Sequence, residues 1–227
     1  GIKMSKSKGN VVSPDDLVRD YGCDSLRMYE LFVGPPELDA EWDDRGIDGV
    51  NRFLKRLWNL LMDSKENEVQ ATKEMIKQRH RMVADITMRL ESFSLNTVIS
   101  GFMEYNNKFI EIAKKEGGID KETLETIAVL LSPFAPHFAE EIWEQLGHTE
   151  TIFKAGWPTY DEAQMKDDEI EVPVQINGKT RAVISISADA SKDEAIAAGK
   201  EAVADKLTGT IVKEIYVPKK IINIVQK

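Results

Sequence analysis

The stretch LNTVISGFMEYNNKFIEIAKKEGG, residues 95–118, decides the fold class of this chain. Its apolar side chains recur every three or four positions, which is the spacing of one face of an α-helix. The glycine pair that follows Glu116 is a typical helix end. We therefore predict a long amphipathic helix with an inward stripe made of Leu95, Val98, Ile99, Phe102, Asn106, Phe109, Ile110 and Ala113.

Neighbouring segments on both sides of this helix show the same period. Asp120 can cap the segment that follows, and Ser132-Pro133 breaks it before a last helix starts. His80 stands in the segment 72–90 without a second ligand at helical spacing, so we interpret it as a surface residue and expect no metal site. Amphipathic helices joined by short loops predict an antiparallel bundle over residues 47–160, with helices over 48–61, 72–90, 95–116, 120–131 and up to 146.

Two shorter helices are expected in the connecting segment 1–46. Ser13 followed by Pro14 is a strong helix start, and Gly22 ends that helix. Asp24 can cap a second helix, which ends before Gly34. These helices are placed to support the loop that precedes them.

The hydrophobic period changes from helical to two after residue 169. Asn177-Gly178 is a type I′ hairpin signal between two alternating segments, and Ser191 with Glu194 predicts a capping box at the start of a helix. The chain is therefore expected to be multidomain and mainly α, with a small α+β domain of ββαββ order at its end. The acidic stretch 161–169 is the expected linker, and the small domain covers residues 170–227, with later strands over 211–217 and 221–225.

Composition excludes several classes of protein. The single cysteine, Cys23, cannot form an internal disulfide, and no apolar run approaches the roughly 18 residues of a membrane span. We expect a cytoplasmic protein with no membrane partner. At 227 residues and 42% hydrophobic content, the chain can bury two cores.

The net charge of −9 argues against nucleic acid as a partner, but the charge is unevenly distributed. Residues 169–227 carry nine Lys and Arg side chains against eight Asp and Glu, so the excess acid lies before them. A locally basic segment of this kind can bind RNA phosphates, and a merely solvated face is the alternative. The candidate contacts are Lys179, Arg181, Lys213, Lys219 and Lys220, together with the stripe Arg52, Lys55 and Arg56 on the helix 48–61.

Phosphate chemistry is also indicated at the start of the chain, in the run Lys3-Met4-Ser5-Lys6-Ser7 followed by Lys8-Gly9-Asn10. Ammonium groups and hydroxyls on a short loop can close over a polyphosphate and neutralise charge that develops in a transition state. The alternative is a solvated basic segment.

The run from Lys3 to Ser7 resembles the signature loop of class I aminoacyl-tRNA synthetases. The sequence from Phe32 to Leu38, then Glu41-Trp42 and the stretch up to Trp58, is similar to the segment that follows this loop in bacterial leucyl-tRNA synthetases. The run LSPFAPHFAEEIW, residues 131–143, resembles the last bundle helices of the same subgroup.

This resemblance implies a parent enzyme that joins leucine to tRNA(Leu) through an adenylate formed from ATP, with Mg²⁺ accompanying the ATP. Lys6 would contact the ATP phosphates, and Lys3 and Ser7 would shape the closed loop. The small domain would bind the outer corner of the tRNA. Because only two residues precede the loop, we expect this chain to be the tail of that enzyme: monomeric, catalytically inactive alone and without bound cofactor, since ATP and leucine would bind an upstream domain.

Three alternatives stay open. The same residues suit a stand-alone RNA-binding module derived from a synthetase, or the equivalent part of an isoleucyl, valyl or methionyl enzyme. A purely structural interaction protein would carry the Lys3 to Ser7 run by chance.

Overall fold

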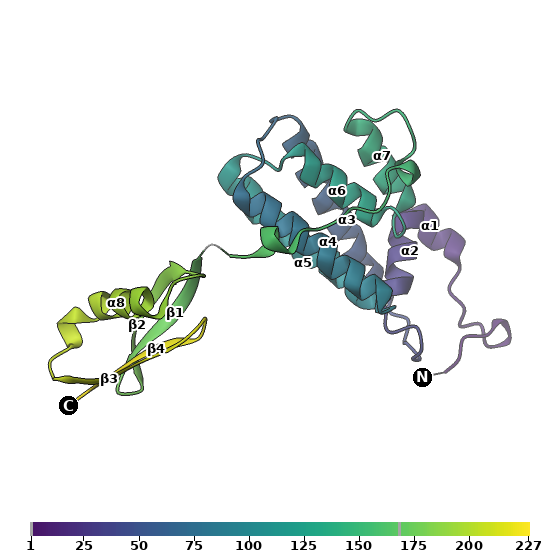
Figure 1. The fold of residues 1–227 in the computed structure, drawn as a ribbon. Coiled ribbons are helices and arrows are strands. Elements are labelled where there is room, and N and C mark those ends of the chain that lie inside the picture. The colour runs from purple at the N-terminus through teal and green to yellow at the C-terminus, as the bar shows by residue number, and fades with distance from the viewer. Residues whose placement is uncertain (1, 168) are drawn as a thin grey trace. The chain divides into compact units, whose positions relative to one another are not determined.

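In the computed structural model, which describes residues 2–167 and 169–227, the chain divides into two compact units. Unit 1 extends to Met165 and is helical, whereas unit 2, Lys166–Lys227, combines a sheet with a helix (Figure 1). Each unit has its own hydrophobic core. The prediction of an α-rich part and a small α+β part is therefore confirmed. Gly1 and Asp168, which belong to the predicted segments 1–46 and 161–169, lie outside the described residues.

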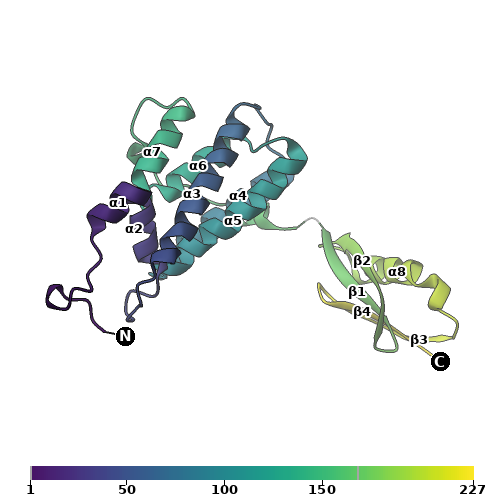
Figure 2. The ribbon, with the colours of Figure 1, turned by 180° about the vertical axis from the view of Figure 1, so that it is seen from behind.

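Unit 1 is a bundle in which the helices of the connecting segment share one core with the rest. Its longest helices lie together in both views, with α4 packed along α5 (Figures 1 and 2). The helix α2 packs against α3, α5 and α7, so it is part of the bundle core. The helices are α1 (Pro14–Tyr21), α2 (Cys23–Phe32), α3 (Asp44–Lys65), α4 (Lys73–Glu91), α5 (Leu95–Glu116), α6 (Lys121–Leu131) and α7 (Pro136–Gln145).

The helix α5 covers the predicted range, but its buried face is wider than the predicted stripe. Ile110 and Ala113 are only half-buried, while Tyr105 and Ile112 are buried. The reason is that α5 is covered by α4 on one side and by α2 and α3 on others, so more than one stripe is removed from water. Gly117 ends the helix in the left-handed conformation, as predicted (φ 83°).

The junction of α2 with α3 is built around one tyrosine. The Tyr29 hydroxyl donates to the carbonyl oxygen of Asp43 at 2.6 Å, and its ring meets Trp42 edge-on at 5.0 Å between centroids. A Cβ atom at Gly46 would overlap the Tyr29 ring, so this position requires glycine. The Asp43 carboxylate caps α3, accepting from the Arg45 N–H at 3.0 Å, and α3 therefore begins four residues before the predicted Asp48.

Residues that follow α7 are held against α4. Trp157 Nε1 donates to Thr87 Oγ1 at 2.9 Å, and the Asp161 N–H donates to His80 Nδ1 at 3.1 Å. A short 3-10 helix, Glu162–Met165, completes this contact and ends unit 1. The first five residues of the expected linker 161–169 thus pack on the bundle.

Unit 2 is a four-stranded sheet with one face covered by α8 (Figure 1). The strand order is β2-β1-β4-β3, in which β1 and β4 pair in parallel and the two outer pairs are antiparallel. A Cβ at Gly199 would lie 3.0 Å from Ile222, which shows how closely α8 approaches the sheet. The elements are β1 (Glu169–Ile176), β2 (Lys179–Ser187), α8 (Lys192–Ala202), β3 (Ile211–Val217) and β4 (Ile221–Gln226).

Two local predictions for unit 2 are confirmed. Asn177 and Gly178 both have positive φ (49° and 79°), as a type I′ turn requires. Ser191 and Glu194 form a reciprocal capping box at the start of α8.

Candidate functional site

The loop at the start of the chain is organised by its own hydrogen bonds. The Ser5 N–H donates to Asn10 Oδ1 at 2.9 Å, which closes the loop around a 3-10 helix, Lys6–Lys8. Gly9 ends this turn in the left-handed conformation (φ 65°) and donates its N–H to the Lys6 carbonyl at 3.2 Å. The loop thus has a defined local shape.

The predicted catalytic side chains of this loop, Lys3, Lys6 and Ser7, are all exposed. The 3-10 turn brings Lys6 and Ser7 together, and Ser7 Oγ lies 3.2 Å from Ser5 Oγ. Lys3 precedes the turn. An exposed ammonium beside hydroxyl donors is chemically suited to a phosphate group.

The cap of α7 comes from a residue that was expected to cap another helix. Asp24 is the second residue of α2 and is buried; its Oδ2 accepts the Phe138 N–H at 2.6 Å, and its Oδ1 lies 3.0 Å from His137 Nδ1. The prediction that Asp24 caps α2 was therefore wrong. Because Ala135, the residue before α7, has no side-chain oxygen, the acid of α2 satisfies the start of α7 instead.

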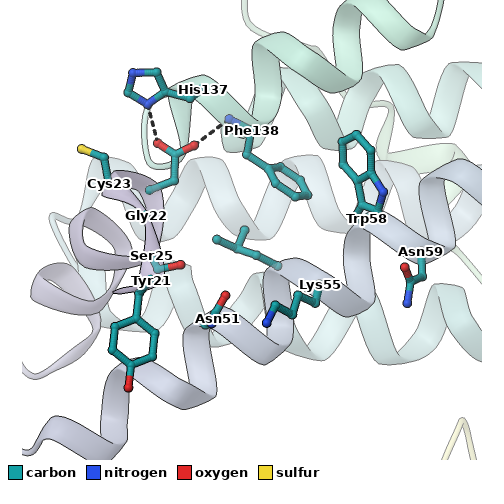
Figure 3. A pocket seen from close by; sticks show the side chains of 12 residues that line it. Tyr21, Gly22, Cys23, Ser25, Asn51, Lys55, Trp58, Asn59, His137 and Phe138 are labelled. Carbon is teal, nitrogen blue, oxygen red and sulfur yellow. Dashed lines mark hydrogen bonds and ion pairs between the residues drawn. The ribbon is translucent and has the colours of Figure 1, made fainter. Parts of the chain in front are cut away.

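An open pocket of about 520 Å³ lies beside this cap (Figure 3). It is bounded by the junction of α1 and α2, by one edge of α3 and by the start of α7. We call it the α3 pocket. Its lining includes Tyr21, Cys23, Ser25, Asn51, Leu54, Lys55, Trp58, Asn59, His137 and Phe138.

One residue of the predicted basic stripe on α3 lines this pocket. Arg52, Lys55 and Arg56 are exposed, and Lys55 lines the α3 pocket. Arg56 lines a second pocket of about 410 Å³ with Lys114, and its Nη2 donates to Asn107 Oδ1 at 2.8 Å. The structure therefore brings this stripe together on one edge of the bundle.

The predicted cations of unit 2 are also exposed, but they are not gathered in one place. Arg181 lies on β2 and Lys213 on β3, the two opposite edge strands, which β1 and β4 separate by about 14 Å. Lys213 is near the start of β3, whereas Lys219 and Lys220 form the turn after its end. Lys179 is the first residue of β2 and directly follows the turn between β1 and β2. A single phosphate cannot contact all five.

Sequence reasoning missed two kinds of residue. Asn51 and Asn59, which flank Lys55 on the same edge of α3, line the α3 pocket; the available signal was that each lies four residues from Lys55. Arg79 is buried at 7% exposure, with Nη1 3.3 Å from Asp120 Oδ2 and 3.0 Å from Glu122 Oε2. It holds α4 to the start of α6 and is not available to RNA.

His80 was expected on the surface, but it is half-buried. Its Nδ1 accepts the Asp161 N–H, and its burial, with a smaller contribution from the charge of Arg79, lowers the pKa of the imidazole. In the described part of the chain, no three His, Cys, Asp or Glu side chains are grouped to hold a metal. Within the same residues, no helix has the length and apolar character needed to cross a membrane.

Comparison with known proteins gives consistent matches along the chain. The family model "Anticodon-binding domain of tRNA ligase" matches residues 72–196, and the model of class I tRNA synthetases for isoleucine, leucine, methionine and valine matches residues 1–43. The chain is 47% identical to the leucine–tRNA ligase of Fervidobacterium nodosum and 44% identical to that of Thermosipho melanesiensis. Both matches cover 100% of this chain and 30% of the relative, so the chain spans less than a third of their length.

A solved structure is similar over the same extent. It is the LeuRS–tRNA–LeuAMS ternary complex from Agrobacterium radiobacter K84, with a TM-score of 0.77 and 27% identity. The match covers 100% of this chain and 31% of that one.

Proposed function

Since this chain belongs to the family of anticodon-binding domains of tRNA ligases, we propose that it is the tRNA-binding part of a leucyl-tRNA synthetase. The observation that carries the proposal is the similarity to leucine–tRNA ligases over the whole chain, at 47% and 44% identity. Similarity to leucine enzymes along both units makes an isoleucyl, valyl or methionyl parent the less favoured reading.

In the parent enzyme we assign the first loop to the adenylation step. The leucine carboxylate attacks the α-phosphorus of ATP, and pyrophosphate leaves. The exposed Lys6 ammonium is suited to stabilise the charge that builds on the phosphates, and Lys3 and Ser7 to shape the loop around them. Magnesium would accompany the ATP; among the described residues, no three His, Cys, Asp or Glu side chains are grouped to hold it.

The chain by itself is proposed to lack this activity. Among the described residues the sheet belongs to unit 2 and has the mixed order β2-β1-β4-β3, which is not the parallel sheet of a nucleotide-binding domain. We expect leucine-dependent exchange of pyrophosphate into ATP to be undetectable with the pure 227-residue chain. Robust exchange that requires leucine would contradict the assignment.

The tRNA-binding role is tested by titration of tRNA(Leu) transcript against the chain at several salt concentrations. If Lys219 and Lys220 contact phosphates, the double variant Lys219→Ala/Lys220→Ala should bind more weakly. The negative slope of the logarithm of the association constant against log [salt] should also become less steep, by about 0.7 to 0.9 for each lost contact. These side chains lie in the exposed turn between β3 and β4, where substitution removes little packing.

A matched control removes two charges elsewhere. Lys121 and Lys154 are exposed lysines of unit 1, each within 4 Å of a glutamate, so Lys121→Ala/Lys154→Ala should leave affinity and slope nearly unchanged. Equal affinity and slope in both double variants would show that Lys219 and Lys220 form only a solvated turn. Absence of tRNA binding by the unmodified chain would remove the proposed function itself.

A further inference from the structure

The α3 pocket has the size and the walls of a site for a flat organic group. Its volume of about 520 Å³ is within the range of about 300–1,000 Å³ typical of ligand sites. Leu54, Trp58 and Phe138 supply apolar wall, and the two rings meet edge-on at 6.0 Å between centroids (Figure 3). Trp58 is half-buried, so part of its indole remains accessible.

One edge of α3 adds polar groups to these walls. Asn51, Lys55 and Asn59 follow one another at intervals of four residues, which places them on the same edge of the helix. Each amide can both donate and accept a hydrogen bond, as the edge of a nucleobase requires, and Lys55 adds an exposed positive charge. The acid in the lining, Asp24, is directed to the start of α7, where both of its oxygens have partners.

The positive charge continues beyond the pocket. The second pocket, of about 410 Å³, shares Asn59 with the α3 pocket and is lined by Arg56 and Lys114, with Asp63 as its acid. The two pockets therefore adjoin at Asn59 on α3, with Lys55 in the first and Arg56 and Lys114 in the second. A linear polyanion with flat side groups matches such neighbouring pockets, whereas a small anion would use only one of them.

We propose that the α3 pocket receives one unstacked base of the RNA partner, while the adjacent phosphates lie along Lys55 and Arg56. Proteins commonly recognise RNA at single-stranded positions, where a base is inserted against aromatic side chains and its edge is hydrogen-bonded. In this arrangement Trp58 contacts the base, and Asn51 and Asn59 face its edge. The inference rests on the proposed tRNA-binding function and specifies a contact within it.

The test uses the fluorescence of Trp58 in the whole chain. Saturation with tRNA(Leu) transcript should quench the part of the tryptophan emission that is lost in Trp58→Phe, because a base in contact with the indole quenches it. Inorganic polyphosphate has the charge but no bases, so it should leave this part of the emission unchanged. Trp58→Phe keeps an aromatic ring at the contact with Phe138.

A second variant tests the phosphate contact independently of the indole. Lys55→Gln should weaken tRNA binding about five- to tenfold, as the loss of one charged phosphate contact implies. It should also make the negative slope of the logarithm of the association constant against log [salt] less steep by about 0.7 to 0.9. Arg45→Gln is the matched control, since it removes one charge from the same helix at a side chain that is 89% exposed and paired with Asp43 at 3.1 Å. It should change the affinity less than twofold.

The outcomes separate this inference from the function on which it rests. If tRNA binds but the Trp58 emission does not change, the pocket receives no base. If Lys55→Gln behaves like Arg45→Gln, the phosphate contact assigned to Lys55 is wrong. If polyphosphate quenches Trp58 as strongly as tRNA does, the pocket responds to charge and the base contact is wrong. If tRNA does not bind at all, the proposed function fails first.

Discussion

Replacement of Lys6 by alanine is expected to slow leucyl-adenylate formation by about 10² or more in a leucyl-tRNA synthetase that carries this chain. The exposed ammonium on the 3-10 turn Lys6–Lys8 would contribute a contact that is strongest when charge develops on the phosphates. Loss of one such contact costs about 2.7 to 4 kcal/mol of transition-state stabilisation. Affinity for tRNA should persist, because the loss is confined to the chemical step. The measurement is leucine-dependent pyrophosphate exchange.

Lys8→Ala is the matched control for this prediction. Lys8 is an exposed lysine on the same turn, but the resemblance gives it no part in the loop signature. A clear difference between the two variants would assign the effect to position 6 rather than to loop charge. An unchanged exchange rate in Lys6→Ala would leave the loop without a catalytic role.

Replacement of Asp120 by alanine is expected to destabilise unit 1 by about 3 kcal/mol, at the lower end of the cost of breaking a buried ion pair. Asp120 is buried and has three partners: Arg79 Nη1, the Thr123 N–H at 3.0 Å and Thr123 Oγ1 at 2.7 Å. The variant loses the cap of α6 and leaves the buried Arg79 beside the exposed carboxylate of Glu122. Arg79 can then be stabilised only in part, because Glu122 is 72% exposed.

Urea denaturation followed by tryptophan fluorescence measures this effect, since all four tryptophans lie in unit 1. The urea concentration at the midpoint of unfolding should fall in Asp120→Ala, while the dependence of the unfolding free energy on urea concentration stays the same. Glu122→Ala is the control and should cost less than about 1 kcal/mol, as is typical of an exposed ion-pair partner. Equal loss of stability in the two variants would show that the cap and the buried pair contribute no more than the exposed pair with Glu122.

Features that depend on neighbouring residues could be predicted from the sequence. The type I′ turn needs only Asn177 and Gly178 in sequence, and the capping box needs only Ser191 and Glu194 three residues later. The helix α5 could be predicted for the same reason, from the helical spacing of its own apolar residues. In each case the stabilising contact lies within one turn or one helix, so the local sequence contains it.

Features that join distant segments could not be predicted in this way. The carboxylate of Asp24 caps a helix that starts more than a hundred residues later, and nothing near Asp24 indicates that choice. The burial of Arg79 likewise depends on how α4 meets α6. The α3 pocket has the same origin, because α1, α2 and α7 must meet α3 before Asn51, Lys55 and Asn59 face a common space.

The parallel pairing of β1 with β4 has a consequence for how unit 2 acquires its structure. Within the described residues, the β1–β2 and β3–β4 hairpins are joined through this pairing, with register Val174↔Ile222, through hydrogen bonds of the Asn177-Gly178 turn to β4, and through α8, which packs on β2, β3 and β4. An isolated two-stranded hairpin is at best marginally stable in water. Neither half can therefore persist alone, and the closure of a loop of nearly fifty residues must precede most of the favourable contacts. Unit 2 should consequently form late and all at once, whereas the helical hairpins of unit 1 can assemble from local contacts.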